Sequence, residues 1–408
     1  MYLKNCPLTR GEAFDKCRRG TNRTLPVEVM EARADAVLDR VPITRVSEIS
    51  RLIGSDLPVF AATTPLARDL TTHMGKGLTP QAARISAIME GVERVSAERV
   101  HAPFRRCSRV ELLRIGEHCA DPERFDLPPD SRYRPDVSIA WVQAWEMIEG
   151  REIWIPADLC RSPPKEGLLT QVDTNGLASG ATRGEAILHA LLEVIERDAV
   201  SQHLFFDIYG GDDRDPPARR AIASQTLPPG CADYLGRLSE GGVSIALTEI
   251  STDIRVPVVE CTIADAAYPS AAGVVCMTFG GWGCDPVMEH AVNRALTEAH
   301  QARIGTIQSA RDSFNLIERR SPLRPAPDPG PDEQSFGRGP PVQPSDSIAE
   351  DVDAILRRLR EVGVDQAIVA DMTDPAIGLP VVRVRVPDLS VFVVDRARVG
   401  WRCMRHLV

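Results

Sequence analysis

The sequence predicts a mixed α/β (α+β) protein in which layered β-sheets pack against helices. Two observations carry this prediction: several segments space their apolar residues as an amphipathic helix does, and short β-branched and apolar runs lie between them. Because both kinds of segment mix along the chain, we expect helices and sheets to share one core. The expected helices are Thr79–Glu98, Thr182–Val200, Asp285–Ile304 and Ile348–Val362. The expected strands are Val59–Ala62, Ile153–Pro156, Val243–Thr248, Val256–Thr262, Ala272–Thr278, Gln366–Met372 and Val381–Val386.

Capping residues mark the starts of three of these helices. Thr79 stands at an N-cap with Pro80 at the first helical position, and the third helix opens with Asp285 and a proline. Thr182 is followed three residues later by Glu185, which predicts a reciprocal capping box.

One Pro- and Gly-rich polar stretch, Ser321–Ser345, cannot supply a hydrophobic face for packing and is expected to be a flexible loop. We therefore divide the chain into an N-terminal segment (1–40), a core (41–320), the loop (321–346) and a C-terminal part (347–408) that returns to the folded core.

Composition excludes several classes of function. The chain has 408 residues with 48 Lys plus Arg, 57 Asp plus Glu and a net charge of −9, so nucleic acid and anionic membranes are not expected partners. The ten cysteines form no C-x-x-C pair, which is typical of reduced thiols. The first residues contain no apolar signal region, and no stretch stays apolar for the length of a bilayer. We expect a cytoplasmic protein.

Two of the expected helices share the pattern T-x-x-x-A-x-x-x-A-x-x-E-x-x-E-R, and a third repeats it in part. Thr79, Ala83, Ala87, Glu90, Glu93 and Arg94 recur 103 residues later as Thr182, Ala186, Ala190, Glu193, Glu196 and Arg197. A third copy has Ala291, Ala295, Glu298 and Gln301 at the matching positions.

The paired glutamates predict a metal site. Residues three apart share a helix face, so Glu90 lies beside Glu93 and Glu193 beside Glu196. The small alanines are expected to let two such helices approach closely, which would gather four acids that cannot all ionise without a cation. Oxygen-only ligands suit Mg²⁺. The alternative is a solvent-facing pair, which is common on helix surfaces, but the apolar residues around the second pair favour an interior position.

Other motifs are weaker. Gly75-Lys76-Gly77, just before the first patterned helix, can present a lysine and backbone N–H groups to a phosphate, or be an ordinary turn, and it is not a Walker A loop. The basic stretch Lys16–Thr24 can clamp a polyphosphate, but by itself we interpret it as solvated. No H-E-x-x-H, G-x-S-x-G or strand-following G-x-G-x-x-G motif is present.

Taken together, several passages resemble the YcaO-domain family from about residue 15 to the C-terminus, the Pro-rich segment excepted. They are ITRVSEISRLIGSDLPVFAATTP, GKGLTPQAARISAIMEGVER, TNGLASGATRGEAILHALLEVIERDA, RALTEAHQAR and MTDPAIGLPVVRVRVP. The resemblance implies the YcaO fold and an enzyme that uses ATP and Mg²⁺ to O-phosphorylate a peptide backbone amide in a ribosomally made, post-translationally modified peptide.

The resemblance also assigns residues. Glu90, Glu93, Glu193 and Glu196 match the family's Mg²⁺-binding glutamates, and Glu193 and Arg197 are the residues we assign to catalysis. The implied nucleotide-binding residues are Arg23, Lys76, Glu185, Arg197 and Gln301. Met30 and Ala181 replace a hydroxyl residue and an asparagine of many relatives, so those two contacts are expected to be missing or remade. The stretch Pro387–Ser390 departs from the family's usual P-G-L-E.

The run RRGTNRTLP followed by VPITRV most resembles stand-alone members that act with a TfuA-like protein in peptide thioamidation. That resemblance implies a precursor peptide as substrate, a TfuA-like partner and a homodimer. Alternatives are an azoline-forming cyclodehydratase, a non-catalytic scaffold that binds a precursor peptide, and a ligase that uses the same ATP site on a small-molecule carboxylate.

Overall fold

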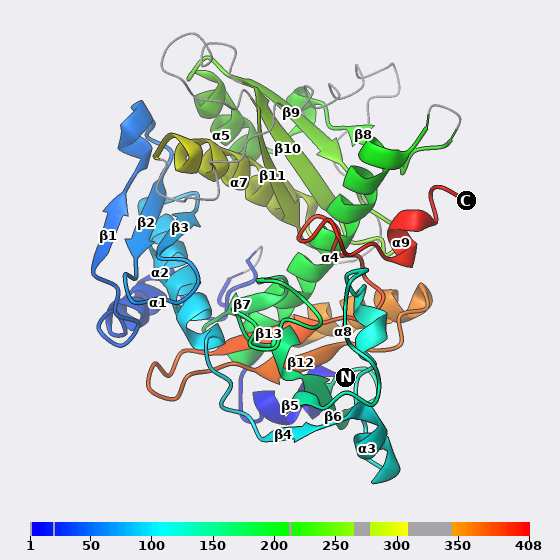
Figure 1. Ribbon diagram of the computed structural model, residues 1–408. Helices are drawn as coiled ribbons and strands as arrows, with labels where there is room; N and C mark the ends of the chain where they lie inside the picture. Colours follow the sequence, from blue (N-terminus) through cyan, green and yellow to red (C-terminus); the bar gives the residue numbers. More distant parts are fainter. Residues whose placement is uncertain (1, 19–20, 212–213, 265–277, 309–344) are drawn as a thin grey trace.

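The computed structural model describes residues 2–18, 21–211, 214–264, 278–308 and 345–408. These residues form three sheets whose strands pair antiparallel (Figure 1). The first has the order β1-β2-β3: Arg45–Glu48, Val59–Thr63 and Thr72–Lys76. The second has the order β11-β10-β9-β8: Thr278–Cys284, Val258–Ala264, Ser244–Glu249 and Arg220–Ala221. The third has the order β4-β5-β12-β13-β7, with β6 also paired to β5: Phe104–Cys107, Ile139–Glu146, Ile368–Asp371, Val381–Arg385, Leu177–Ser179 and Arg151–Pro156.

The helices lie against these sheets. They are α1 (Val27–Asp35), α2 (Pro80–Ala97), α3 (Arg109–Arg114), α4 (Arg183–Tyr209), α5 (Pro229–Ser239), α7 (Met288–Gln308), α8 (Ile348–Glu361) and α9 (Trp401–Met404). Short 3₁₀ turns cover Leu3–Asn5, Pro7–Thr9, Ser50–Ile53, Pro122–Phe125, Ala157–Leu159 and Ser224–Thr226. Within the described ranges, every helix is too short or too polar to cross a bilayer.

Helix α4 is the central element. It begins beside β7 and β13 and runs through the middle of the molecule toward β8 (Figure 1). Its apolar residues join those of α8 in one buried cluster. A second cluster lies between α2 and the third sheet, and a third lies between α5, α7 and the second sheet. Because α4 contacts both β7 and β11, it connects the layers that carry the other two patterned helices.

Each patterned helix follows a strand and packs against a glycine in or just after it. A Cβ on Gly75 of β3 would lie 2.1 Å from the carbonyl oxygen of Ala83, and one on Gly283 of β11 would lie 2.1 Å from that of Ala291. A Cβ on Gly180, after β7, would lie 2.7 Å from the backbone nitrogen of Ala186. The expectation that the alanines bring two helices together is therefore wrong for these contacts: alanines and glycines bring each helix onto its own strand.

The α/β architecture is confirmed, with corrections at some boundaries. The strands expected near 59, 153, 243, 256, 366 and 381 and the four helices are present, and α4 continues nine residues past Val200 to Tyr209. The third patterned helix begins at Met288, because Asp285 Oδ1 accepts a hydrogen bond from the backbone N–H of Val287 in a turn that precedes it (2.9 Å). The strand expected over 272–278 lies outside the described residues except for Thr278, where β11 begins, and the loop expected over 321–346 lies outside them up to 344.

Candidate active site

The carboxylates of α2 are held by backbone groups of two strands. Glu90 Oε2 accepts a hydrogen bond from the N–H of Met74 in β3 (2.8 Å). Glu93 Oε1 accepts from both the N–H and the hydroxyl of Ser179 at the end of β7 (2.8 and 2.7 Å). The pKa of Glu93 is raised to about 8, chiefly by burial; the nearby charges of Glu193 and Glu90 add to the rise, and the hydrogen bonds from Ser179 oppose it. The α2 pair therefore faces the α4 pair.

The carboxylates of α4 are the more deeply placed pair. Burial raises the pKa of Glu193 to about 7, with Glu196 adding to the effect and Arg197 opposing it. Glu196 is 1% exposed, and its Oε2 atom has no hydrogen-bond partner among the described residues. Burial also raises the pKa of Glu196, and the charge of Glu298 contributes in the same direction. A buried carboxylate oxygen without a partner is a position that a cation can fill.

Two cations border this carboxylate group. Lys76, at the end of β3, forms an ion pair with Glu298 of α7. Arg197 Nη2 lies 3.8 Å from Glu196 Oε1 and 4.0 Å from Glu298 Oε1, and its guanidinium lies over the ring of Trp282, 5.8 Å from the centroid. Burial opposes ionisation of Glu298, but Lys76 and Arg197 outweigh it and lower the pKa of that carboxyl.

The N-terminal segment reaches α4 at Glu185. Arg23 Nη1 lies 2.7 Å from Glu185 Oε1, while the N–H and hydroxyl of Thr24 donate to Oε2 (3.1 and 3.0 Å). The predicted capping box is therefore wrong in one half: Thr182 accepts from the N–H of Glu185 (3.1 Å), but the Glu185 carboxylate is bound to the N-terminal segment. Arg23 keeps 57% of its side chain exposed, which leaves its other nitrogens open to a further anion.

The basic stretch is also not simply solvated. Lys16 Nζ lies 2.5 Å from Asp351 Oδ2 of α8, and these side chains are 4% and 1% exposed. This buried ion pair, together with a backbone bond from Lys16 to Asp346 (3.0 Å), attaches the N-terminal segment to the C-terminal part. The attachment fixes the segment that carries Arg23.

Gln301 contacts the protein backbone. Its Nε2 donates to the carbonyl of Met74 (2.7 Å), the same residue whose N–H is bound by Glu90. The backbone N–H and carbonyl of Met74 are thus bound by side chains of two helices of the repeat, α2 and α7. The assignment of Gln301 to the nucleotide stays a prediction.

The two departures from the family pattern have local explanations. Met30 packs against the apolar cluster between α2 and the third sheet. Ala181 is buried, and its carbonyl accepts a hydrogen bond from Arg33 Nη1 of α1 (3.4 Å). Their effect on a nucleotide contact stays a prediction.

The structure thus brings the four predicted metal ligands into one electrostatic group, next to Lys76 and Arg197. Within the described ranges, no three His, Cys, Asp or Glu side chains converge tightly enough to form a ready-made metal site. The residues nevertheless fit Mg²⁺: they are oxygen donors, three of them have raised pKa values because of burial and one another, and the Oε2 atom of Glu196 is buried without a partner.

Sequence reasoning assigned no site role to Glu298 or Ser179. Glu298 had a signal, because it is the third copy of the position held by Glu90 and Glu193. Ser179 had none beyond its place in a small-residue loop, since its contact with Glu93 joins residues 86 positions apart.

Comparison with known proteins identifies the family. A family model described as YcaO cyclodehydratase, ATP- and Mg²⁺-binding, matches residues 74–390, and the chain belongs to this family. The predicted family and cofactors, ATP and Mg²⁺, are therefore confirmed.

Two relatives cover most of the chain. An uncharacterized protein of Methanothermobacter thermautotrophicus is 34% identical over 92% of this chain and 97% of its own length. An uncharacterized protein in the tfuA 3′ region of Rhizobium leguminosarum bv. trifolii is 30% identical over 86% of this chain and 84% of its own.

Two solved structures share the fold. YcaO from Methanopyrus kandleri, bound with AMPPCP and Mg²⁺, has a TM-score of 0.72 and 22% identity over 95% of this chain and 98% of that one. A heterocyclase in complex with substrate and cofactor has a TM-score of 0.72 and 21% identity over 95% of this chain and 57% of that one.

Proposed function

We propose that the chain uses Mg-ATP to phosphorylate the oxygen of a peptide backbone amide in a ribosomally made precursor peptide, and that the product is a thioamide. The observation that carries the proposal is the group of largely buried carboxylates on α2 and α4, which adjoins Lys76 and Arg197 and in which Glu93 and Glu193 have raised pKa values. Phosphoryl transfer depends on such an arrangement, in which divalent cations and fixed positive charges surround the transferred group.

Each part of the site has a task in this scheme. Glu90, Glu93, Glu193 and Glu196 would hold Mg²⁺, which neutralises phosphate charge when bound. Lys76 and Arg197, now directed at Glu298, lie where they can exchange a carboxylate for phosphate oxygens.

The half-exposed Arg23 would hold the nucleotide from the N-terminal segment, where Glu185 orients it. The amide oxygen gains the phosphoryl group as ADP leaves. Sulfide then adds to the amide carbon and expels phosphate.

Thioamidation with a TfuA-like partner is supported by the relative in a tfuA 3′ region, which is 30% identical to this chain. On this proposal the substrate is a precursor peptide and the enzyme is a homodimer. Light scattering during size-exclusion chromatography would test the dimer, and a monomer would contradict it.

Azoline formation is the second candidate. It is favoured by the family's description as a cyclodehydratase and by the fold shared with a heterocyclase bound to its substrate. Mass spectrometry of a precursor peptide incubated with ATP and sulfide distinguishes the two reactions. Thioamidation exchanges oxygen for heavier sulfur, whereas cyclodehydration removes water.

Calorimetric titration of ATP with and without Mg²⁺ tests the underlying site. We expect Mg²⁺-dependent binding of ATP that weakens by about 100-fold in Glu193→Gln. Loss of a residue that supports a metal ligand lowers metal affinity by about 10- to 100-fold, and loss of the ligand itself should lower it at least as much. The matched control is Glu361→Gln, whose side chain is 59% exposed on α8 and which should bind as the natural protein does. Mg²⁺-dependent binding that survives in Glu193→Gln would contradict the carboxylate assignment.

A further inference from the structure

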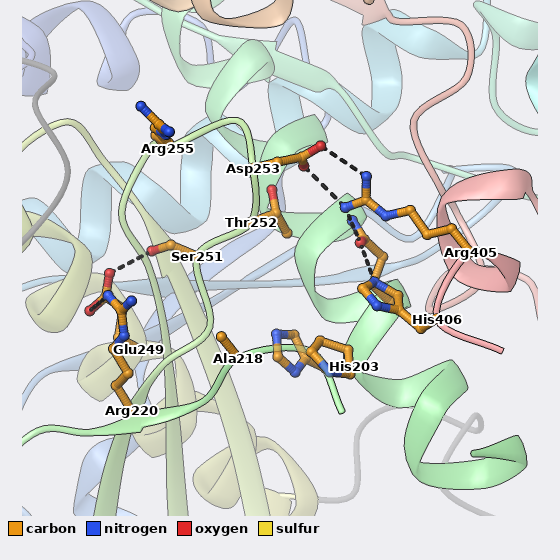
Figure 2. Close-up of a pocket in the computed structure, with 12 residues that line it drawn as sticks. His203, Ala218, Arg220, Glu249, Ser251, Thr252, Asp253, Arg255, Arg405 and His406 are labelled. Atoms are coloured by element: carbon orange, nitrogen blue, oxygen red, sulfur yellow. Dashed lines mark hydrogen bonds and ion pairs between the residues drawn. The ribbon is translucent and has the colours of Figure 1, made fainter. Parts of the chain in front are cut away.

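A cavity lies farther along α4 than the carboxylates. Its volume is about 470 Å³, within the range of ligand pockets (Figure 2). Its walls come from α4, the strands β8 and β9, the loop after β9 and the residues after α9. Gln202 of this cavity follows Glu196 by six residues, or roughly 9 Å along a helix, so the cavity is distinct from the carboxylate site.

The acidic groups of this cavity are already engaged. Both oxygens of Asp253 accept hydrogen bonds from Arg405 (2.8 and 3.1 Å) and from Arg402 (2.6 and 3.3 Å). Glu249 Oε1 accepts a hydrogen bond from the hydroxyl of Ser251 (3.0 Å; Figure 2). Arg405 also donates to Gln202 (2.9 Å), so the groups on this side hold one another in place.

Two arginines on the other side are less engaged. The guanidinium of Arg255 has no hydrogen bond or ion pair with any other residue that the structure describes, and its side chain is exposed. Arg220 Nη1 lies 3.9 Å from Glu249 Oε2, an ion-pair distance without a hydrogen bond, and the side chain is 48% exposed. Each of these guanidiniums lies at the edge of the cavity, where it can pair with an anionic group (Figure 2).

The backbone fixes Arg255 at this position. Its φ is +60°, a left-handed conformation that costs a non-glycine residue about 1 kcal/mol or more. The turn is closed by a bond from the Arg255 N–H to the carbonyl of Thr252 (3.0 Å) and anchored by Ile254, which is fully buried. This strained turn therefore places the positively charged side chain of Arg255 at the edge of the cavity.

We propose that this cavity binds a carboxylate of an extended peptide, with Arg255 and Arg220 as its ligands. Glu249 and Asp253 line the same cavity and would repel a doubly charged phosphate more than a carboxylate. The peptide backbone can also exchange hydrogen bonds with the hydroxyls of Ser251 and Thr252. That the ligand is a peptide rests on the proposed function, whereas its negative charge rests on the cavity alone.

Ligand-observed NMR on the full chain tests the proposal with acetyl-Ala-Ala-Glu-Ala-Ala-amide and its Gln counterpart. A third probe has Gln and a free C-terminal carboxylate, which separates a side-chain carboxylate from a terminal one. We expect a carboxylate-bearing probe to bind, and Arg255→Asn or Arg220→Ala to weaken it about tenfold, because each removes a charge-assisted hydrogen bond. Asn is chosen at 255 because it tolerates positive φ.

The control is Arg51→Ala, which makes the same charge change at a side chain that is 81% exposed elsewhere. Equal binding of all three peptides, equal weakening in Arg51→Ala, or inorganic phosphate binding more tightly than either carboxylate probe would each overturn the proposal. Calorimetric titration of Mg-ATP into the same samples keeps the two proposals separate. If the natural protein binds the peptide but not Mg-ATP, only the proposed function is contradicted. If it binds Mg-ATP but none of the peptides, only the cavity proposal is contradicted.

Discussion

Two of the charge clusters that the described residues form have opposite charge balances. The acidic cluster consists of Glu90, Glu93, Glu193 and Glu196. The arginine cluster consists of Asp173 and the three arginines around it, Arg383, Arg385 and Arg398, each at most 4% exposed on its side chain. In the first cluster carboxylates lie close to one another, and in the second the guanidiniums outnumber the carboxylate.

The arginine cluster is satisfied in part from within the protein. Arg398 donates to the carbonyls of Phe125 and Asp126 (2.6 and 2.9 Å), and Arg385 donates to that of Leu159 (2.7 Å). Burial would raise the pKa of Asp173, but the three arginines outweigh it and lower that pKa. Fixed carbonyls thus take some of the surplus donors, while Arg383 Nε and Nη1 and Arg385 Nη2 are buried without a hydrogen-bond partner among the described residues.

The acidic cluster is satisfied only in part. Ser179 and the N–H of Met74 bind one carboxylate oxygen of each α2 glutamate, while Glu196 Oε2 has no partner among the described residues. The pKa values of Glu93, Glu193 and Glu196 are raised, whereas that of Asp173 is lowered. The difference teaches that the balance of charge, and not burial alone, decides which cluster favours a cation. Positive charge surrounds Asp173 and keeps it ionised, whereas the glutamates favour protonation unless a cation joins them.

The largest effect on stability should come from neutralising Asp173, the carboxylate of the arginine cluster. We expect Asp173→Asn to lower the free energy of unfolding by about 3 to 5 kcal/mol, because it leaves three buried arginines without their shared carboxylate. Urea unfolding measured by circular dichroism checks this. A loss no greater than that of an exposed Asp→Asn change, such as Asp233 on α5, would show that the two clusters do not differ as described.

The same neutralisation in the acidic cluster should have the opposite sign. Without metal at pH 8.5, Glu193→Gln should raise the free energy of unfolding by about 1 kcal/mol, because it removes a carboxylate whose ionised form is disfavoured in the folded state. The urea titration used for Asp173→Asn measures it. Destabilisation of Glu193→Gln would contradict the view that its charge is poorly compensated.

The acidic cluster should also make stability fall with rising pH. Glu93 and Glu193 have folded pKa values of about 8 and 7, above the ordinary value of 4.5, so between pH 4.5 and 8 the folded state binds more protons than the unfolded state. The stabilisation is complete below pH 4.5 and disappears as pH rises through 7 and 8.

Thermal unfolding without metal across this range measures the effect. Mg²⁺ should reduce the slope because it binds the ionised carboxylates. The natural protein should lose more stability over this range than the Glu93→Gln, Glu193→Gln double variant does. Equal slopes would refute the assignment of the titration to these residues.

The sequence alone revealed the carboxylates but not what surrounds them. Glu90, Glu93, Glu193 and Glu196 could be found because helical periodicity is local and the pattern repeats. The arginine cluster could not, because Asp173 and Arg385 are 212 residues apart and no spacing rule connects them. The Glu185 carboxylate was misassigned for the same reason: a local capping rule competed with Arg23, 162 residues away, and the distant partner prevailed.

The smallest effect should separate hydrogen bonding from burial in the acidic cluster. Ser179→Ala removes one of the two hydrogen bonds that Glu93 Oε1 accepts from this residue, while the bond from the backbone N–H remains (2.8 Å). Both bonds favour the ionised carboxylate, so losing one should raise the pKa of Glu93 further and weaken Mg²⁺ binding at pH 7 by about threefold. Because the weakening comes from protonation, it should shrink as pH is raised to 9, which calorimetric titration of Mg-ATP at the two pH values would show. A deficit that is the same at both pH values would mean that Ser179 positions the carboxylate without tuning its charge, and the distinction between the two clusters would then rest on Glu193 and Glu196 alone.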